Sequence, residues 1–503
     1  MAQSLPEPAT PLHKLEFVLL FLLTVLLFIY VTAHLDSRAA QNDAQENLQV
    51  GLTLSQTSVY GPTPTSIGYH QREPFIPGLI ALMDLGHRVL SFDRANRDCA
   101  SPEHVTESTC RTSYQSYKIL NAFFFALLPI VCFLLTLRLT KHRVLAYGVA
   151  LWIGLDKTLI EQTHTFVSEV PAAFLVVAAT LVSIRFADRA TIRKGIGLGV
   201  LLAALTLTKV VFAYAWLFIL LALVVNAKLQ DTFDRRFLVG VTALAAAYAV
   251  LVGGYMTRNA LQANDFALVE NRSYPVHGIR ASYNSMSDAE FRAGFTYYLP
   301  GSKKDPDLMG RFDIRADNGF RQMGIRAYQD RSEKLSDEGR SPAEVSSELS
   351  ANAQRDMLES PIQHLKISLL MAYRGLFVMQ GFGHESRSRN STIAQGLGFD
   401  NFPRLGVHFP SFVQAVLGIG SFLALLGVAL LAWLRRETVL FLAVLLALYS
   451  HSVYALVSHF IPRYSVPVLP LRIVALVACL YFVIRGLQKL VHESRLRQSR
   501  SNA

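Results

Sequence analysis

The chain has 503 residues, of which 51% are hydrophobic and only 17% are charged. Soluble domains carry about 25% charged residues, and the mean hydropathy of this chain is +0.31. This apolar, weakly charged composition excludes a soluble enzyme, a disordered protein and a disulfide-dense secreted module. Much of the surface must therefore face lipid. The net charge of +11 is attributed to basic cytoplasmic loops of a membrane protein, and nucleic-acid binding is not expected.

Several apolar segments are long enough to cross a bilayer as helices, for which about 17 to 25 residues are needed. Ten are expected, at residues 15–33, 117–137, 144–160, 166–184, 195–209, 210–227, 237–256, 411–433, 438–457 and 466–484. They predict an all-α polytopic membrane protein. Residues 195–227 fit either a hairpin or one long helix, and the hairpin keeps the later loops on the sides that their charges demand.

Basic residues follow every second segment and set the expected orientation. They are Arg138, Lys141, Arg143, Arg185, Arg189, Arg193, Lys194, Lys228, Arg235, Arg236, Arg435, Arg436, Arg485, Lys489, Arg495, Arg497 and Arg500. All lie on one side of the membrane if both termini are cytoplasmic. The compact N-terminus and the absence of a sorting signal favour a bacterial inner membrane.

This topology divides the chain into four regions. Residues 1–256 form a membrane core with a long first outer loop at 34–116, and residues 257–410 form a small, mostly helical outer region. Residues 411–487 add C-terminal transmembrane helices, and 488–503 form a basic cytoplasmic tail.

Three stretches within the two outer regions are expected to be helices that do not cross the membrane. Residues 75–92 suit a helix lying along the surface, and 321–359 suit a charged, solvated helical pair. The apolar stretch 367–382 is expected to be an interfacial or buried helix. If it crossed, Arg435 and Arg436 would lie outside.

Acidic residues cluster directly after the first segment, at Asp36, Asp43 and Glu46. A carboxylate next to a membrane helix is partly desolvated, which raises its pKa and suits it to general-base work. Alternatively, Asn42 and Asp43 cap the helix that follows. The two roles are compatible.

Further polar residues are expected at the outer membrane boundary: Glu169, Lys209, Arg258, Arg463 and Tyr464. A carboxylate at membrane depth is costly and points to function, although Glu169 could simply pair with Lys209. Cations at this depth suit a lipid phosphate or pyrophosphate. The alternative is ordinary Lys and Arg side chains reaching from the membrane to water.

A short polar element, residues 69–78, holds His70 and Arg72 directly before two prolines, Pro74 and Pro77. Prolines three residues apart make a rigid turn, which fits a substrate loop or simply the start of a surface helix.

The order of these motifs resembles the GT-C superfamily of glycosyltransferases that use polyprenyl-phosphate sugars. It is most similar to the protein-mannosyltransferase and aminoarabinose-transferase group, of the glycosyltransferase family 39 type. The motif residues present, in order, are Asp43, Arg72, Pro74, Pro77, Ser168, Glu169, Leu207, Thr208, Lys209, Arg463, Tyr464 and Pro467. A P-W-x-x-R-N element is matched only by Tyr255, Arg258 and Asn259, and Asn47 replaces a usual aromatic.

The resemblance implies an inverting transfer from a polyprenyl-phosphate sugar to an acceptor on the outer face. The acceptor is a glycan, a lipid or a protein, and membrane lipid surrounds the enzyme. The expected roles are catalysis for Asp43, Glu46 and Glu169, phosphate binding for Lys209, Arg258 and Arg463, and substrate-loop contacts for His70, Arg72 and Tyr464. Some members need a divalent metal. No ligand spacing for one is evident here, so no metal-binding residue is assigned.

Asp43 is the preferred base. Asp36 lies too near the end of the membrane helix and precedes Arg38, which would pair with it, whereas Glu46 lies one turn beyond Asp43. Glu46 is therefore expected to share its site or to face the donor.

Two other classes of protein remain as alternatives. A transporter or flippase of lipid-linked glycans predicts inverted repeats and broken helices at the membrane midplane, which the sequence does not display. A polymerase or ligase of the O-antigen type shares a large outer loop but does not require the acid after the first segment.

Cys99 and Cys110 lie close together in the first outer loop. Since disulfides persist in oxidising compartments, we expect them to be bridged. Two free thiols are the alternative.

Overall fold

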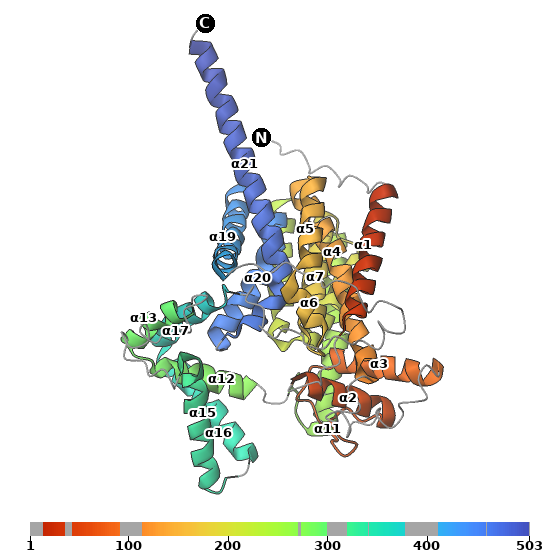
Figure 1. The fold of residues 1–503 in the computed structure, drawn as a ribbon, viewed down its shortest axis with the longest axis vertical. Helices are drawn as coiled ribbons and strands as arrows, with labels where there is room; N and C mark the ends of the chain where they lie inside the picture. Colours follow the sequence, from red (N-terminus) through yellow and green to blue (C-terminus); the bar gives the residue numbers. More distant parts are fainter. Residues whose placement is uncertain are drawn as a thin grey trace.

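The computed structural model describes residues 14–35, 43–90, 113–269, 273–298, 319–340, 342–377, 411–458 and 460–501. All elements in these ranges are helices. Figure 1 shows a bundle of long helices with shorter helices gathered at its lower end. The predicted all-α polytopic fold is confirmed. Asp36, Cys99 and Cys110, with the predicted disulfide, lie outside the described residues.

Eight helices of the described residues are long and apolar enough to cross a membrane. They are built on α1 (Lys14–Ala33), α4 (Ile119–Thr140), α7 (Glu169–Asp188), α9 (Ala215–Leu229), α10 (Arg235–Tyr248) continued by η6 (Ala249–Gly253) and α11 (Gly254–Ala263), α19 (Ser411–Arg435), α20 (Thr438–Val457) and α21 (Leu469–Ser501).

The other two predicted spans are helical but shorter. The segment predicted at 144–160 is interrupted at Asp156, between α5 (Arg143–Leu155) and α6 (Lys157–Thr163). The Asp156 carboxylate accepts a hydrogen bond from the Leu159 amide at 3.0 Å, and thereby caps a new helix within an apolar run.

The segment predicted at 195–209 is α8 (Ile192–Thr208), a helix of 17 residues. It ends before α9 begins, so residues 195–227 form two helices rather than one. The hairpin interpretation of this stretch is therefore correct.

Glycine allows α8 and α10 to pack closely. A Cβ atom on Gly195 would lie 2.1 Å from the carbonyl oxygen of Gly240, and one on Gly199 would lie 2.4 Å from that of Leu244. Backbone atoms cannot move aside as a flexible side chain can. The two helix axes therefore approach as closely as they do only because these positions lack side chains.

Replacing Gly195 by Ala is therefore expected to destabilise the protein, since overpacking costs about 1–3 kcal/mol. Gly197→Ala is the matched control on the same helix, because a Cβ there meets nothing within 4 Å and Ala favours a helix by about 1 kcal/mol over Gly. Thermal unfolding in detergent should give a lower melting temperature for Gly195→Ala and an equal or higher one for Gly197→Ala. Equal melting temperatures for the two variants would contradict the packing argument.

Two helices that follow α1 lie at the lower end of the bundle. They are α2 (Asp43–Thr57) and α3 (Phe75–Leu90), and α3 lies crosswise below the long helices (Figure 1). On α3, Ile76 and Ile80 are buried while Leu82 and Leu85 are exposed. This matches the surface helix predicted at 75–92.

The region after α11 forms a second group of helices near the same end of the bundle (Figure 1). It comprises α12 (Ser273–Ser282), α13 (Asp288–Tyr297), α15 (Gly319–Asp337), α16 (Pro342–Glu359) and α17 (Pro361–Arg374). The predicted helical pair is confirmed as α15 and α16, which pack on α12.

The helix predicted near 367–382 is α17, which begins earlier and ends at Arg374. Ile367 and Leu370 are fully buried, whereas Ile362 and Leu369 are exposed. One face therefore packs on the protein and the other is apolar and open, as an interfacial helix requires.

Candidate active site

The carboxylate of Asp43, the first residue of α2, lies between two arginines. Its Oδ1 accepts a hydrogen bond from Nη2 of Arg72 at 2.8 Å, and its Oδ2 accepts one from Nη2 of Arg463 at 2.5 Å. Arg72 belongs to the loop between α2 and α3. Arg463 belongs to η9 (Pro462–Val468), which precedes α21. Residues 420 positions apart in the sequence therefore meet at one carboxylate.

These arginines reverse the pKa shift that was expected for Asp43. Burial raises the pKa of the Asp43 carboxyl, but the charges and hydrogen bonds of Arg72 and Arg463 outweigh it and hold this pKa well below its usual range. The expectation of a raised pKa is therefore wrong for this arrangement. Asp43 is ionised at every physiological pH, and its basicity is weakened as long as both arginines contact it.

Glu46 shares Arg72 with Asp43. It lies one turn further along α2, where its carboxylate accepts hydrogen bonds from the Arg72 guanidinium and from the Tyr69 hydroxyl. The Arg72 side chain is only 5% exposed. Two acids on one helix are thus joined through a single buried cation.

A second ion pair lies beside the first. Glu169, the first residue of α7, pairs with Lys209 at the C-terminal end of α8, with Nζ and Oε1 3.2 Å apart. The Nε atom of Arg463 lies 3.8 Å from the same glutamate oxygen. The pairing that was the alternative to a functional Glu169 is therefore present. Because Arg463 contacts both Glu169 and Asp43, however, this pair is part of the same cluster.

Three buried polar atoms of the cluster have no hydrogen-bond partner among the described residues. They are Oε2 of Glu169, Nε of Arg72 and Nε of Arg463. Most buried polar atoms in proteins are hydrogen-bonded. Of these, Oε2 of Glu169 and Nε of Arg463 give one acceptor and one donor for a polar ligand, next to a carboxylate that is 2% exposed.

Tyr464 forms an aromatic wall beside the cations. Nζ of Lys209 lies 5.9 Å and the Arg463 guanidinium 5.8 Å from the centre of its ring. The ring stacks on Tyr454 of α20, with centroids 4.5 Å apart and planes at 13°. This packing limits the freedom of both cationic side chains.

His70 and Arg258, two other predicted site residues, hold the loop that carries Arg72. His70 lies 2.9 Å from an oxygen of Asp265, and Arg258 donates to the Tyr69 carbonyl at 2.9 Å and lies 5.2 Å from the ring of Tyr60. None of these contacts involves the Asp43 carboxylate. A phosphate-binding role for Arg258 remains a prediction.

Some members of the site were not predicted from the sequence. Tyr69, which contacts Glu46, and Tyr454, which supports Tyr464, were not singled out for a role. Arg72 was assigned to a substrate loop, although it is a direct partner of Asp43 and Glu46. The position of Tyr69 and Arg72 could have indicated a role in the site, because they lie three residues apart, just before Pro74 and Pro77.

Within the described ranges, no three His, Cys, Asp or Glu side chains are grouped so as to hold a metal ion. The acids of the site are instead surrounded by Arg72, Lys209 and Arg463. These cations can bind an anion directly.

The fold and the site define a polytopic membrane protein of the GT-C type, with its charged cluster at one end of the bundle. Residues 91–253 match the family model PMT, described as dolichyl-phosphate-mannose-protein mannosyltransferase. The resemblance to the GT-C superfamily, family 39 type, is thereby confirmed. The match to residues 91–253 supports a membrane glycosyltransferase of the kind that uses a polyprenyl-phosphate sugar. No curated protein matches the chain.

The matched region contains only part of the site. Glu169 and Lys209 lie inside it, whereas Asp43 precedes it and Arg258 and Arg463 follow it. The roles of these last three residues therefore depend on the geometry of the site.

Proposed function

We propose that the protein transfers a sugar from a polyprenyl-phosphate donor to an acceptor hydroxyl with inversion, and that Asp43 is the general base. The acceptor is a hydroxyl of a glycan, a lipid or a protein. The observation that carries the proposal is the shared contact of Arg463 with Asp43 and Glu169. It joins a candidate base to cations that suit a phosphate at the end of a membrane-spanning bundle.

The donor phosphate competes with Asp43 for Arg463. The guanidinium has an Nε donor without a hydrogen-bond partner among the described residues, and a phosphate can accept from it in a two-pronged way. Lys209 can donate to the same phosphate, because its ammonium has three donors. When Arg463 turns to the phosphate, Asp43 loses one of its two cations and becomes more basic. Donor binding thus activates the base.

The transfer itself is a single displacement. The acceptor oxygen forms a bond to the anomeric carbon as its proton moves to Asp43. The bond from that carbon to the phosphate oxygen breaks, and the electron pair leaves with the polyprenyl phosphate. Arg463 and Lys209 stabilise the charge that develops on the leaving group. Oε2 of Glu169 remains available to accept a hydrogen bond from a sugar hydroxyl.

The proposal sets the orientation of the chain. The end of the bundle that holds Asp43 faces outward, and both termini are cytoplasmic, in a bacterial inner membrane. The basic residues at the other end support this orientation.

Two engineered cysteines test that orientation. On intact cells, a membrane-impermeant maleimide is expected to label Ser332→Cys on α15. It should label Ser494→Cys, on the last turns of α21, only after permeabilisation. The unsubstituted chain gives the background from the native thiols. Labelling of Ser494→Cys in intact cells would contradict the orientation.

The function is tested on the surface glycans of a deletion strain by mass spectrometry, with complementation by the wild-type chain and by Asp43→Asn. The expected result is the loss of a single sugar that only the wild-type chain restores. Accumulation of a complete but untransported lipid-linked glycan would instead favour a flippase. A change in glycan length alone would favour a polymerase.

A further inference from the structure

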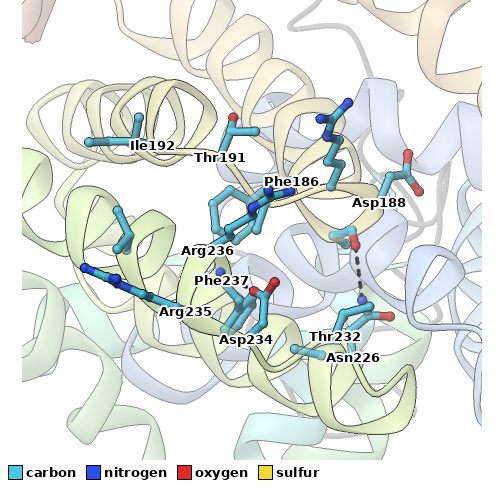
Figure 2. A pocket seen from close by; sticks show the side chains of 15 residues that line it. Phe186, Asp188, Thr191, Ile192, Asn226, Thr232, Asp234, Arg235, Arg236 and Phe237 are labelled. Carbon is cyan, nitrogen blue, oxygen red and sulfur yellow. Dashed lines mark hydrogen bonds between the residues drawn. The ribbon is translucent and has the colours of Figure 1, made fainter.

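A cavity of about 800 Å³ lies at the other end of the bundle from Asp43. It is bounded by the turn from α7 to α8 and the turn from α9 to α10. Phe186 and Phe237 line its inner part, with ring centroids 6.0 Å apart (Figure 2). Since α7 has 20 residues, about 30 Å of helix separates this cavity from Glu169. It is therefore distinct from the candidate active site.

Three arginines line this cavity: Arg189, Arg235 and Arg236. All three side chains are exposed, and within the described residues none has an ion-pair partner. In the view of Figure 2, the Arg236 side chain crosses the ring of Phe186, whereas Arg235 points away from both phenylalanines. The cavity thus combines cations with an apolar interior.

The carboxylates that line the same cavity already have other partners. Asp188 pairs with Arg138 at 2.5 Å. Asp234 accepts a hydrogen bond at 2.8 Å from the Phe237 amide, which caps α10. They therefore do not neutralise the three arginines by direct contact, and the site favours an anion.

One flank of the cavity is apolar and exposed. Ile192 is 53% exposed and Val239 is 44% exposed, and both line the cavity. Ile192 is the first residue of α8 and Val239 is the fifth residue of α10, and the N-termini of these two helices add positive potential near the same place. A ligand that fits must be anionic where it meets the arginines and apolar where it meets this flank.

We propose that this cavity binds the phosphate headgroup of an anionic glycerophospholipid, on the face of the membrane opposite the catalytic site. The acyl chains run along Ile192 and Val239, and the phosphate accepts hydrogen bonds from Arg235, Arg236 and Arg189. Basic pockets between transmembrane helices on the cytoplasmic side commonly hold such headgroups. The orientation proposed above places this cavity on that side.

The test uses the full chain reconstituted in nanodiscs of phosphatidylcholine with an increasing fraction of phosphatidylglycerol. Thermal unfolding of the wild-type chain is expected to shift upward as phosphatidylglycerol increases, because a ligand that binds the folded state stabilises it. The triple variant Arg189→Gln/Arg235→Gln/Arg236→Gln should need roughly 100-fold more anionic lipid for the same shift. Native mass spectrometry should show one retained lipid fewer on this variant.

The matched control removes the same charge elsewhere. Arg485→Gln/Arg495→Gln/Arg497→Gln changes three exposed arginines of α21, and this variant should respond to phosphatidylglycerol as the wild type does. Equal loss in both triple variants would overturn the site, because it would reflect net charge alone. Stabilisation of the wild type by inorganic phosphate in pure phosphatidylcholine, to the same extent as by phosphatidylglycerol, would overturn the lipid assignment.

Discussion

Replacing Asp43 by Asn is expected to lower turnover by roughly 100- to 10,000-fold, the usual contribution of a general base. Asn preserves the size of the side chain and caps a helix about as well as Asp. The variant weakens the ion pairs with Arg72 and Arg463, but the buried Arg72 keeps its contact with Glu46, and the Asn oxygen can still accept a hydrogen bond from an arginine. We therefore expect at most a modest fall in the melting temperature. A collapse of turnover in a variant that still folds would identify Asp43 as the base.

Glu46→Gln is the matched control for this experiment. Glu46 lies on the same helix and contacts the same Arg72, so this variant disturbs the arginine without removing the proposed base. We expect a much smaller loss of turnover. Near-normal turnover in Asp43→Asn with loss in Glu46→Gln, or in Asp36→Asn, would move the base to that residue.

The location of the site could be predicted from the sequence because it depends on topology alone. Glu169, Lys209 and Arg463 each lie at the end of an apolar segment. The alternating direction of successive segments brings these ends to one side of the membrane. The pairing of Glu169 with Lys209, which was the alternative to a functional role of Glu169, is present as well.

The partners of Asp43 could not be predicted in this way. The contact of Arg72 with Asp43 depends on the path of the loop before Pro74. That path is held by tertiary contacts such as the hydrogen bond from the Tyr60 hydroxyl to the Arg72 carbonyl at 2.8 Å. The predicted direction of the Asp43 pKa shift was wrong for the same reason. The burial of Asp43, which raises its pKa, can be estimated from its position next to a membrane helix. The lowering of this pKa by Arg72 and Arg463 depends on side-chain distances that the sequence does not contain.

The interruption of the third predicted span has a different origin. Hydropathy averages over a window, so a single Asp156 within an apolar run does not change the prediction of a span. The signal was nevertheless present, since an Asp that precedes a short helix is a typical N-cap. Local capping decided where the helix ended, and apolar composition decided only that a helix would form.

Replacing Arg463 by Lys should lower activity well below that of the wild type while the protein still inserts and folds. Lysine retains the positive charge but loses the planar fork that contacts Asp43 through Nη2 and approaches Glu169 through Nε. A single ammonium cannot contact both carboxylates as the guanidinium does, and it cannot form two parallel hydrogen bonds to a phosphate. The Michaelis constant for the lipid donor should therefore rise as turnover falls, whereas the constant for the acceptor should change little. Arg355→Lys, on the exposed surface of α16, controls for the substitution itself.

The pH dependence of Arg463→Ala separates a role in the site from anchoring at the membrane interface. Arg463 helps to hold the pKa of Asp43 below its usual range, so its removal raises that pKa toward the ordinary value. The base is then deprotonated only at higher pH. The acid limb of kcat/KM, which reports the free enzyme, should move upward in pH relative to the wild type. An anchor at the interface would not move this limb, and full activity in Arg463→Ala with an unchanged pH profile would show that Arg463 serves only as such an anchor.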